Sequence, residues 1–179
     1  MRIIGGSLGG LEIRAPRGDL TRPTADKVRQ ALFNILGNIV GQELHGAVLD
    51  LYAGSGALGL EAISRGAERA VFVDKATDAV RCIAANAATL GVTDRTQIVR
   101  AEVTKALPRL GGPFDLVFID PPYASGEADR ALALLAPLVA PGAVVVVEHD
   151  RRSPPKDAIG PFSFRDRRRY GDTEVSFYQ

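Results

Sequence analysis

The sequence predicts an α/β fold whose sheet is mostly parallel and ends in an antiparallel hairpin. Three observations lead to this prediction. From residue 46 onward, short β-prone runs alternate with helical segments, which is typical of a parallel sheet covered on both faces. The first run ends in a glycine-rich turn that opens a helix. The last two runs are separated only by Tyr170-Gly171-Asp172, which leaves no room for a crossover helix.

Each expected element follows from its apolar pattern and from the residues that end it. Expected strands occupy residues 47–52, 70–73, 97–100, 114–119, 143–148, 162–168 and 173–178. Expected helices occupy residues 58–65, 77–90, 104–110 and 127–139. We expect Pro141-Gly142 to stop the last of these helices, because neither residue continues a helix well.

The stretch before this alternation is expected to form an extension. Residues 2–4 and 11–13 are β-prone, and the glycine-rich segment between them predicts a hairpin. A helix should begin near Thr24, which can cap it, and should end at a glycine. The predicted organisation is an extension over residues 1–45 and a main domain over residues 46–179.

The composition is that of an ordinary globular protein, with 46% hydrophobic and 24% charged residues among 179. A single cysteine, Cys82, excludes an internal disulfide and a zinc site that needs several thiolates. The two histidines, His45 and His149, stand far apart, so we expect no metal. No apolar stretch approaches the ~20 residues of a membrane helix, and the start has no signal-peptide core. We expect a cytoplasmic protein without a membrane partner, and its small size favours a monomer.

The charges are unevenly distributed along the chain. Residues 1–30 carry six basic and three acidic side chains, and residues 151–179 carry seven basic and four acidic ones. The net charge of the whole chain is only +1, so the middle is acidic. Two basic ends predict a surface for a polyanion, although ordinary solvated faces would have the same composition.

A glycine-rich turn joins the first expected strand to the next helix. Gly54 and Gly56 let the backbone turn sharply and approach a ligand, and Gly59 lets the helix pack closely. Asp74 ends the following strand, where a carboxylate can accept both hydroxyls of a ribose. This spacing predicts an adenosine-type cofactor without specifying which one. Asp50 favours S-adenosylmethionine over a dinucleotide, because a carboxylate before the turn suits a cationic amino group.

The tetrapeptide Asp120-Pro121-Pro122-Tyr123 follows the buried strand expected at residues 114–119. Two prolines stiffen the loop, so that the Asp120 carboxylate and the Pro121 carbonyl can both point at one donor group. The exocyclic amine of a nucleobase is such a donor, and two acceptors can orient it for attack on a methyl sulfonium. Tyr123 offers a face on which an extruded base can stack.

These motifs resemble those of a known enzyme class. Residues 49–59, Asp74 and residues 120–123 look like motifs I, II and IV of class I S-adenosylmethionine-dependent amino-methyltransferases. Residues 2–6 and 22–34 resemble the RsmD family, which methylates N2 of a guanine in bacterial 16S rRNA. The resemblance covers nearly the whole chain. The family often has Phe in place of Tyr123, and tyrosine keeps the stacking face.

The resemblance implies a Rossmann-like class I methyltransferase sheet, S-adenosylmethionine as cofactor with S-adenosylhomocysteine as product, and 16S rRNA as partner, free or within a 30S subunit or assembly intermediate. The implied cofactor-binding residues are Asp50, Gly54, Ser55, Gly56, Asp74 and Glu102. The residues that would receive the base are Asp120, Pro121 and Tyr123. The basic N-terminal segment would bind rRNA phosphates and cover the cofactor, through Arg2, Arg14, Arg17, Arg22 and Arg29.

Three other functions fit part of the sequence. An amino-methyltransferase acting on adenine N6 or cytosine N4, in DNA or another RNA, would use the same tetrapeptide. A dehydrogenase that uses NAD would share the glycine turn, but it would need a substrate domain that is not visible. An RNA-binding module without catalysis would not need the intact cofactor turn. Methylation of cytosine C5 is disfavoured because Cys82 lies inside an expected helix.

Overall fold

The computed structural model describes residues 1–16, 23–122 and 126–179. The helices in this part of the chain are α1 (Pro23–Val40), α2 (Ala57–Ser64), α3 (Thr77–Thr89), α4 (Val103–Ala106) and α5 (Glu127–Leu135). Short 3-10 turns are η1 (Thr93–Arg95), η2 (Leu107–Arg109) and η3 (Ala136–Leu138). The strands are β1 (Ala47–Leu51), β2 (Arg69–Asp74), β3 (Thr96–Arg100), β4 (Phe114–Ile119), β5 (Val139–Asp150), β6 (Ala158–Ile159), β7 (Phe162–Tyr170) and β8 (Thr173–Tyr178).

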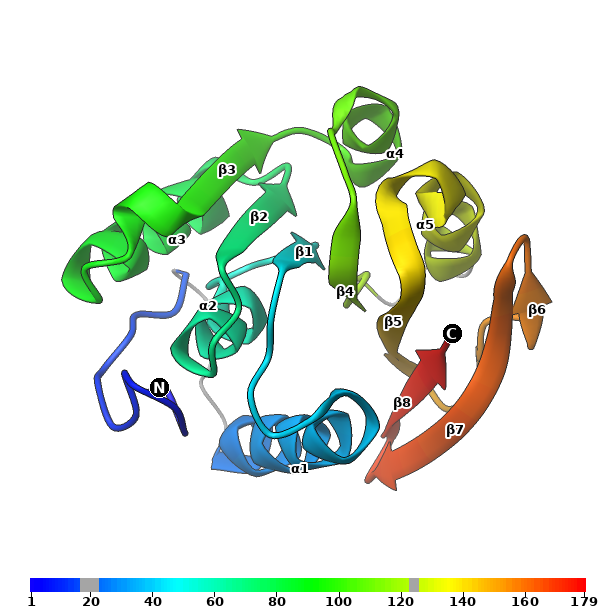
Figure 1. Cartoon of the computed structure of the whole chain (residues 1–179), viewed down its shortest axis with the longest axis horizontal. Helices are drawn as coiled ribbons and strands as arrows, with labels where there is room; N and C mark the ends of the chain where they lie inside the picture. Colours follow the sequence, from blue (N-terminus) through cyan, green and yellow to red (C-terminus); the bar gives the residue numbers. More distant parts are fainter. Residues whose placement is uncertain (17–22, 123–125) are drawn as a thin grey trace.

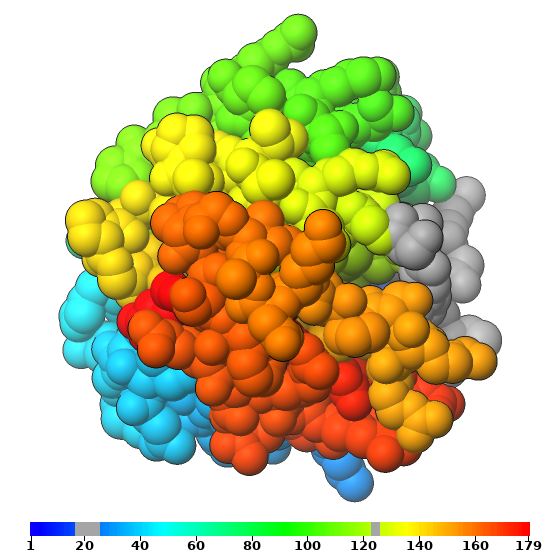
Figure 2. Space-filling model, turned by 90° about the vertical axis from the view of Figure 1, so that its right-hand side faces the viewer, coloured from blue at the N-terminus to red at the C-terminus, as the bar shows by residue number. Residues whose placement is uncertain are grey.

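All strands described by the structure belong to one sheet, in the order β3-β2-β1-β4-β5-β8-β7-β6. The first five pair in parallel, and β8 joins β5 antiparallel. Tyr170 pairs with Thr173 across the tight turn between β7 and β8, so the predicted antiparallel ending is confirmed. Figure 2 shows the face of the molecule over β6 and β7, between α5 in yellow and α1 in blue. The short β6 was not predicted.

Helices cover both faces of the sheet (Figure 1). Because side chains alternate along a strand, each strand contributes to two apolar clusters. The cluster under α1, α2 and α3 includes Val48, Phe72, Phe118 and Val146. The cluster under α4 and α5 includes Leu49, Val71, Val117 and Val145. The predicted α/β fold is therefore confirmed, and both clusters hold the strand ends in fixed positions.

The stretch after α5 differs from the prediction. We expected Pro141 and Gly142 to stop a helix and the strand to start after them. Instead, Val139 already pairs with Phe114, and the register shifts before regular pairing resumes at Val144. Pro141 and Gly142 therefore lie in an irregular part of β5, where a proline is tolerated because the bulged residue does not donate to the ladder.

The N-terminal segment pairs with itself more loosely than a hairpin does. Arg2 and Glu12 form a single antiparallel bridge. The Ile3 N–H donates to the Leu11 carbonyl at 2.9 Å, and the Gly10 N–H donates to the Ile3 carbonyl at 2.8 Å. The two β-prone runs are thus side by side as expected, without forming continuous strands.

The buried carboxylate of Glu61, in α2, attaches this segment to the sheet domain. It accepts the Ile4 N–H at 2.7 Å and the Gly5 N–H at 2.9 Å. It also pairs with Arg65 at 2.8 Å and lies 3.8 Å from the Arg29 guanidinium of α1. Residues on both sides of the predicted boundary at residue 45 therefore share one interior, and the boundary itself stays a prediction.

We predict that Glu61→Gln destabilises the protein by about 3 kcal/mol, because it removes the buried negative charge that pairs with Arg65 and faces Arg29. Urea unfolding followed by circular dichroism measures this loss. The exposed Glu68→Gln provides the control and should change stability by less than about 0.5 kcal/mol. Equal unfolding midpoints for the two variants would contradict the role assigned to Glu61.

Candidate functional site

The strand order places a cavity beyond the carboxyl end of the sheet. The order reverses at β1, which lies between β2 and β4, and open α/β sheets bind ligands at such a point. A cavity of about 440 Å³ lies there. Four neighbouring strands each contribute a residue at or just after their ends, namely Tyr52, Asp74, Glu102 and Asp120. The cavity is large enough for a small-molecule ligand.

Asp74 holds the glycine turn and also lines the cavity. Its Oδ2 accepts the Gly54 N–H at 2.9 Å, and its Oδ1 accepts the Ala76 N–H at 2.8 Å. Gly54 and Gly56 both have positive φ angles, 54° and 77°, which explains why glycine is required at these turns. A carboxylate has about four acceptor sites, so Asp74 can still accept hydrogen bonds from a ligand.

Asp50 lies below the turn and is 2% exposed. Its Oδ2 accepts the Gly59 N–H at 2.9 Å and so fixes the start of α2. A side chain on Gly59 would collide with the Phe72 ring, so the close packing predicted for this glycine is confirmed. Asp50 is not in the wall of the cavity, and its predicted contact with an amino group stays a prediction.

The loop from Gly54 to Gly56 lies beside the cavity rather than in its described wall. The Ser55 hydroxyl donates to the Met1 sulfur at 3.4 Å, and its carbonyl accepts from the Asn86 amide at 2.9 Å. Asn86 also exchanges hydrogen bonds with both backbone groups of Arg14. The N-terminal segment therefore rests on the glycine turn. Sequence reasoning missed Asn86. The one sign of its role in the sequence is that it is a polar residue on the apolar side of α3.

Glu102 occupies the position directly before α4 and lines the cavity. Its Oε2 lies 2.6 Å from the Lys105 ammonium, and this contact holds the pKa of the carboxyl below its ordinary value. The side chain is half exposed, so it can turn toward a ligand. Its predicted place opposite an adenine stays a prediction.

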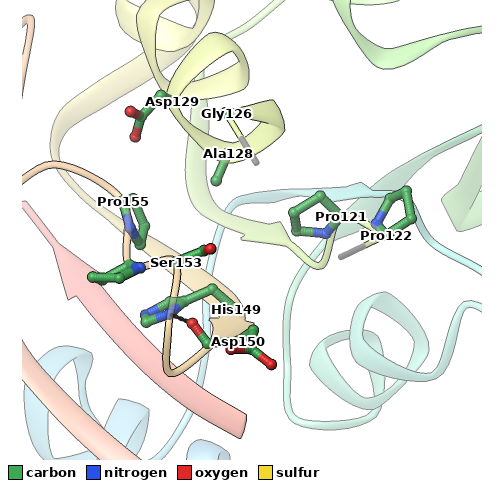
Figure 3. Close-up of a pocket in the computed structure, with 10 residues that line it drawn as sticks. Pro121, Pro122, Gly126, Ala128, Asp129, His149, Asp150, Ser153 and Pro155 are labelled. Carbon is green, nitrogen blue, oxygen red and sulfur yellow. Dashed lines mark hydrogen bonds between the residues drawn. The ribbon is translucent and has the colours of Figure 1, made fainter. Parts of the chain in front are cut away.

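Asp120 and the two prolines after it separate this cavity from a second one. Asp120 and Pro122 line the first cavity. Pro121 and Pro122 line the second, of about 220 Å³, which also receives residues from the end of β5 and the start of α5 (Figure 3). The segment from Asp120 to Pro122 therefore forms the boundary between the two cavities, and Pro122 lines both. Tyr123 lies outside the described residues.

Two further cavity residues escaped the sequence reasoning. The Tyr52 hydroxyl donates to Glu127 Oε2 at 2.7 Å and so links the end of β1 to the start of α5. Burial raises the pKa of Tyr52, which keeps its proton for this bond. Tyr52 also has a positive φ of 59°, an uncommon conformation for a residue with a side chain. Its place directly after a strand, before the glycine turn, is the signal that could have identified it.

The predicted RNA-binding arginines have different surroundings. Arg2 and Arg14 are exposed. Their backbones are fixed, Arg2 by its bridge to Glu12 and Arg14 by Asn86, so their side chains emerge at defined places. Arg17 and Arg22 lie outside the described residues.

Arg29 requires a correction, because it is only 5% exposed. Its guanidinium donates to the Arg2 carbonyl at 2.6 Å and to Asp26 Oδ1 at 2.9 Å, and it faces Glu61. A buried cation with internal partners cannot reach a phosphate. Arg29 therefore supports the N-terminal segment and is not part of an RNA surface. The helical spacing in the sequence had not shown which way its side chain points.

Burial raises the pKa of Asp50 from an ordinary value of 3.8 to about 7, with a smaller increase from Asp74, while the Gly59 hydrogen bond acts in the opposite direction. Between these two pH values the folded state keeps a proton that the unfolded state releases. The free energy of unfolding therefore falls as the pH rises through this range. We predict that Asp50→Asn removes this pH-dependent decrease. The free energy of unfolding of the variant minus that of the parent should therefore become more positive from pH 5 to pH 8. Urea unfolding at each pH measures the difference, and a difference that is constant with pH would contradict the prediction.

No helix in the described ranges is long and apolar enough to cross a membrane. The profile of the family described as "Conserved hypothetical protein 95" matches residues 1–179. "Putative rRNA methyltransferase YlbH" of Bacillus subtilis (strain 168) is 35% identical over 184 residues, covering 100% of this chain and 98% of the relative.

"Ribosomal RNA small subunit methyltransferase D" of Escherichia coli (strain K12) is 36% identical over 135 residues, covering 75% of this chain and 66% of the relative. Among solved structures, "Putative methyltransferase yhhF from Escherichia coli" has a TM-score of 0.84 and 32% identity, covering 100% of this chain and 97% of that chain. By its match to the family profile and to these relatives, the chain therefore belongs to the conserved hypothetical protein 95 family, which is the RsmD family of small-subunit rRNA methyltransferases with the class I methyltransferase fold.

Proposed function

We propose that this protein transfers a methyl group from S-adenosylmethionine to the exocyclic N2 amine of a guanine in 16S rRNA. The observation that carries the proposal is the segment from Asp120 to Pro122, which borders both cavities: Asp120 lines the larger one, Pro121 the smaller one and Pro122 both. A donor held on one side and a base held on the other would meet at this boundary. The small-subunit rRNA methyltransferases among the relatives support the rRNA substrate.

The residues of the larger cavity fit S-adenosylmethionine. Asp74 can accept the two ribose hydroxyls with the acceptor sites that the turn leaves unused. Glu102 stands at the end of the next strand, where it would face the adenine. The glycine turn and Asp50 would lie toward the methionine part. The cofactor supplies an electrophilic methyl group on a sulfonium, and the chain supplies its position.

At this boundary, the Asp120 carboxylate and the Pro121 carbonyl would accept the two hydrogens of the base amine. The lone pair of an aromatic amine is delocalised into the ring, so the amine is a poor nucleophile. Two fixed acceptors favour a tetrahedral nitrogen whose lone pair points at the methyl carbon. As the N–C bond forms, the C–S bond breaks and its electron pair stays on sulfur. One proton then leaves the nitrogen for Asp120 or solvent.

We predict that the protein methylates 30S particles from a strain that lacks it, and that mass mapping of the rRNA places the methyl group on guanine N2. Asp120→Asn should reduce kcat by about 10²–10³-fold, because one acceptor at the amine is lost. Its affinity for S-adenosylmethionine, measured by calorimetry, should stay unchanged. The exposed Asp94→Asn is the matched control and should keep full activity.

A methyl group on adenine N6 or cytosine N4 would instead support the alternative substrates. Full activity of the Asp120→Asn variant would show that the amine is oriented by other groups. Binding of NAD in place of S-adenosylmethionine would support a dehydrogenase.

The exposed Arg2 and Arg14 next to the glycine turn are proposed to contact rRNA phosphates. We predict that Arg2→Gln and Arg14→Gln each weaken 16S rRNA binding and each reduce the slope of log K against log salt by about 1, because one phosphate contact is lost. Filter binding over a salt series measures this slope. The control is Arg109→Gln, at an exposed residue of the short turn η2 that directly follows α4. If the two variants show the same slope as the control, the proposal that Arg2 and Arg14 contact rRNA phosphates is wrong.

A further inference from the structure

One side of the second cavity is polar, and no role has yet been assigned to its side chains. It lies between Pro121 and the segment that follows β5, as Figure 3 shows, with Asp150 and Ser153 across from the prolines. Its volume of about 220 Å³ is below the usual range for drug-sized ligands and suits a single planar ring system. Under the proposed function, on which this inference rests, that ring system is the target base.

Asp150 supplies an acceptor to this cavity. It ends β5, pairs with Thr173 of β8, and its side chain is 23% exposed. The hydrogen bonds that the described chain makes to this carboxylate all fall on Oδ1, from the Arg152 N–H at 2.7 Å and from Arg152 Nε at 3.3 Å. Oδ2 is therefore available to a ligand. The same two bonds hold the pKa of Asp150 below its ordinary value, so the carboxylate stays ionised.

Both ring nitrogens of the neighbouring His149 already have hydrogen-bond partners within the protein. Its Nε2 lies 2.8 Å from the Ser176 hydroxyl, which accepts a hydrogen bond from Arg167 Nε at 3.0 Å. The Asp150 carbonyl can only accept, so Nδ1–H donates to it at 3.0 Å. In a neutral ring Nε2 then accepts the Ser176 proton. Burial lowers the pKa of His149, consistent with a neutral ring that makes one bond of each kind. His149 is thus a positioning residue that fixes the backbone of Asp150.

We infer that Asp150 is the residue that selects guanine, by accepting the N1–H of the base whose N2 amine lies at Asp120. Guanine is the base in which a ring N–H donor stands next to the exocyclic amine. Adenine and cytosine have a ring nitrogen with a lone pair in that position, which an ionised carboxylate repels. Enzymes that extrude a base read it by hydrogen bonds to this edge. The same carboxylate would thus favour guanine and reject the other two amino bases.

The surroundings of the cavity suit an RNA strand. Arg151 and Arg152 follow Asp150 directly, and both are exposed. They place positive charge at the edge of the cavity, where the backbone of an extruded nucleotide would run. This basic group lies in the C-terminal part of the chain, apart from the N-terminal arginines.

The test compares two substrates with the same enzyme preparation. Reconstituted 30S particles carry either guanine or 2-aminopurine at the mapped position. 2-Aminopurine keeps the amine, but its N1 is an acceptor. The parent enzyme should prefer guanine by 10–100-fold in kcat/KM, in line with about 1–3 kcal/mol for a specific base contact. In Asp150→Asn the amide can donate to N1 of 2-aminopurine, so the preference should shrink at least tenfold.

A preference ratio does not depend on the fraction of folded enzyme, so a merely structural role for Asp150 would leave it unchanged. Asp172→Asn, in the exposed turn between β7 and β8, makes the same charge change outside the cavity and should keep the parent ratio. An unchanged ratio in Asp150→Asn, with guanine N2 still methylated by the parent enzyme, would overturn the role of Asp150 alone. Absence of methylation of guanine by the parent enzyme would instead overturn the proposed function.

Discussion

Two carboxylates hold the glycine turn against the sheet, and the site is built around this attachment. Asp50 at the end of β1 accepts the Gly59 N–H, and Asp74 at the end of β2 accepts the Gly54 N–H. A turn with few side chains has little packing of its own, so its geometry depends on such hydrogen bonds. Asp50 has to be buried to reach Gly59, and its raised pKa is the consequence of that burial. The turn and the cavity beside it are thus fixed before any ligand binds.

The N-terminal segment is held on the outside of the same turn. Glu61 accepts two of its backbone N–H groups, and Asn86 links Arg14 to Ser55. Exposed basic side chains therefore stand next to the turn because buried polar groups anchor their backbone. Under the proposed function, a change in Glu61 or Asn86 would act on RNA binding through this anchoring, without any contact between those residues and RNA.

Sequence reasoning predicted the fold and the strand-end residues, since alternation of apolar runs and the ends of parallel strands follow from spacing alone. It did not predict side-chain direction on helices, so Arg29 was assigned to the surface although it is buried. It also missed Tyr52, because its hydrogen bond to Glu127 joins residues far apart in the sequence. It did not single out Asp150, because only the folded chain places that residue in the wall of the second cavity. The irregular start of β5 was missed because local turn residues predict a stop, while pairing with β4 decides the structure.

The strand order also explains why the Asp-Pro-Pro segment follows β4 and no other strand. Residues after β1, β2, β3 and β4 line the larger cavity, whereas the smaller one receives residues from the ends of β4 and β5. Because β4 lies between β1 and β5, its end is the place that borders both cavities. A group that must touch donor and acceptor together has to stand there. Two prolines suit this position, since a wall between two ligands must keep its shape when either side is filled.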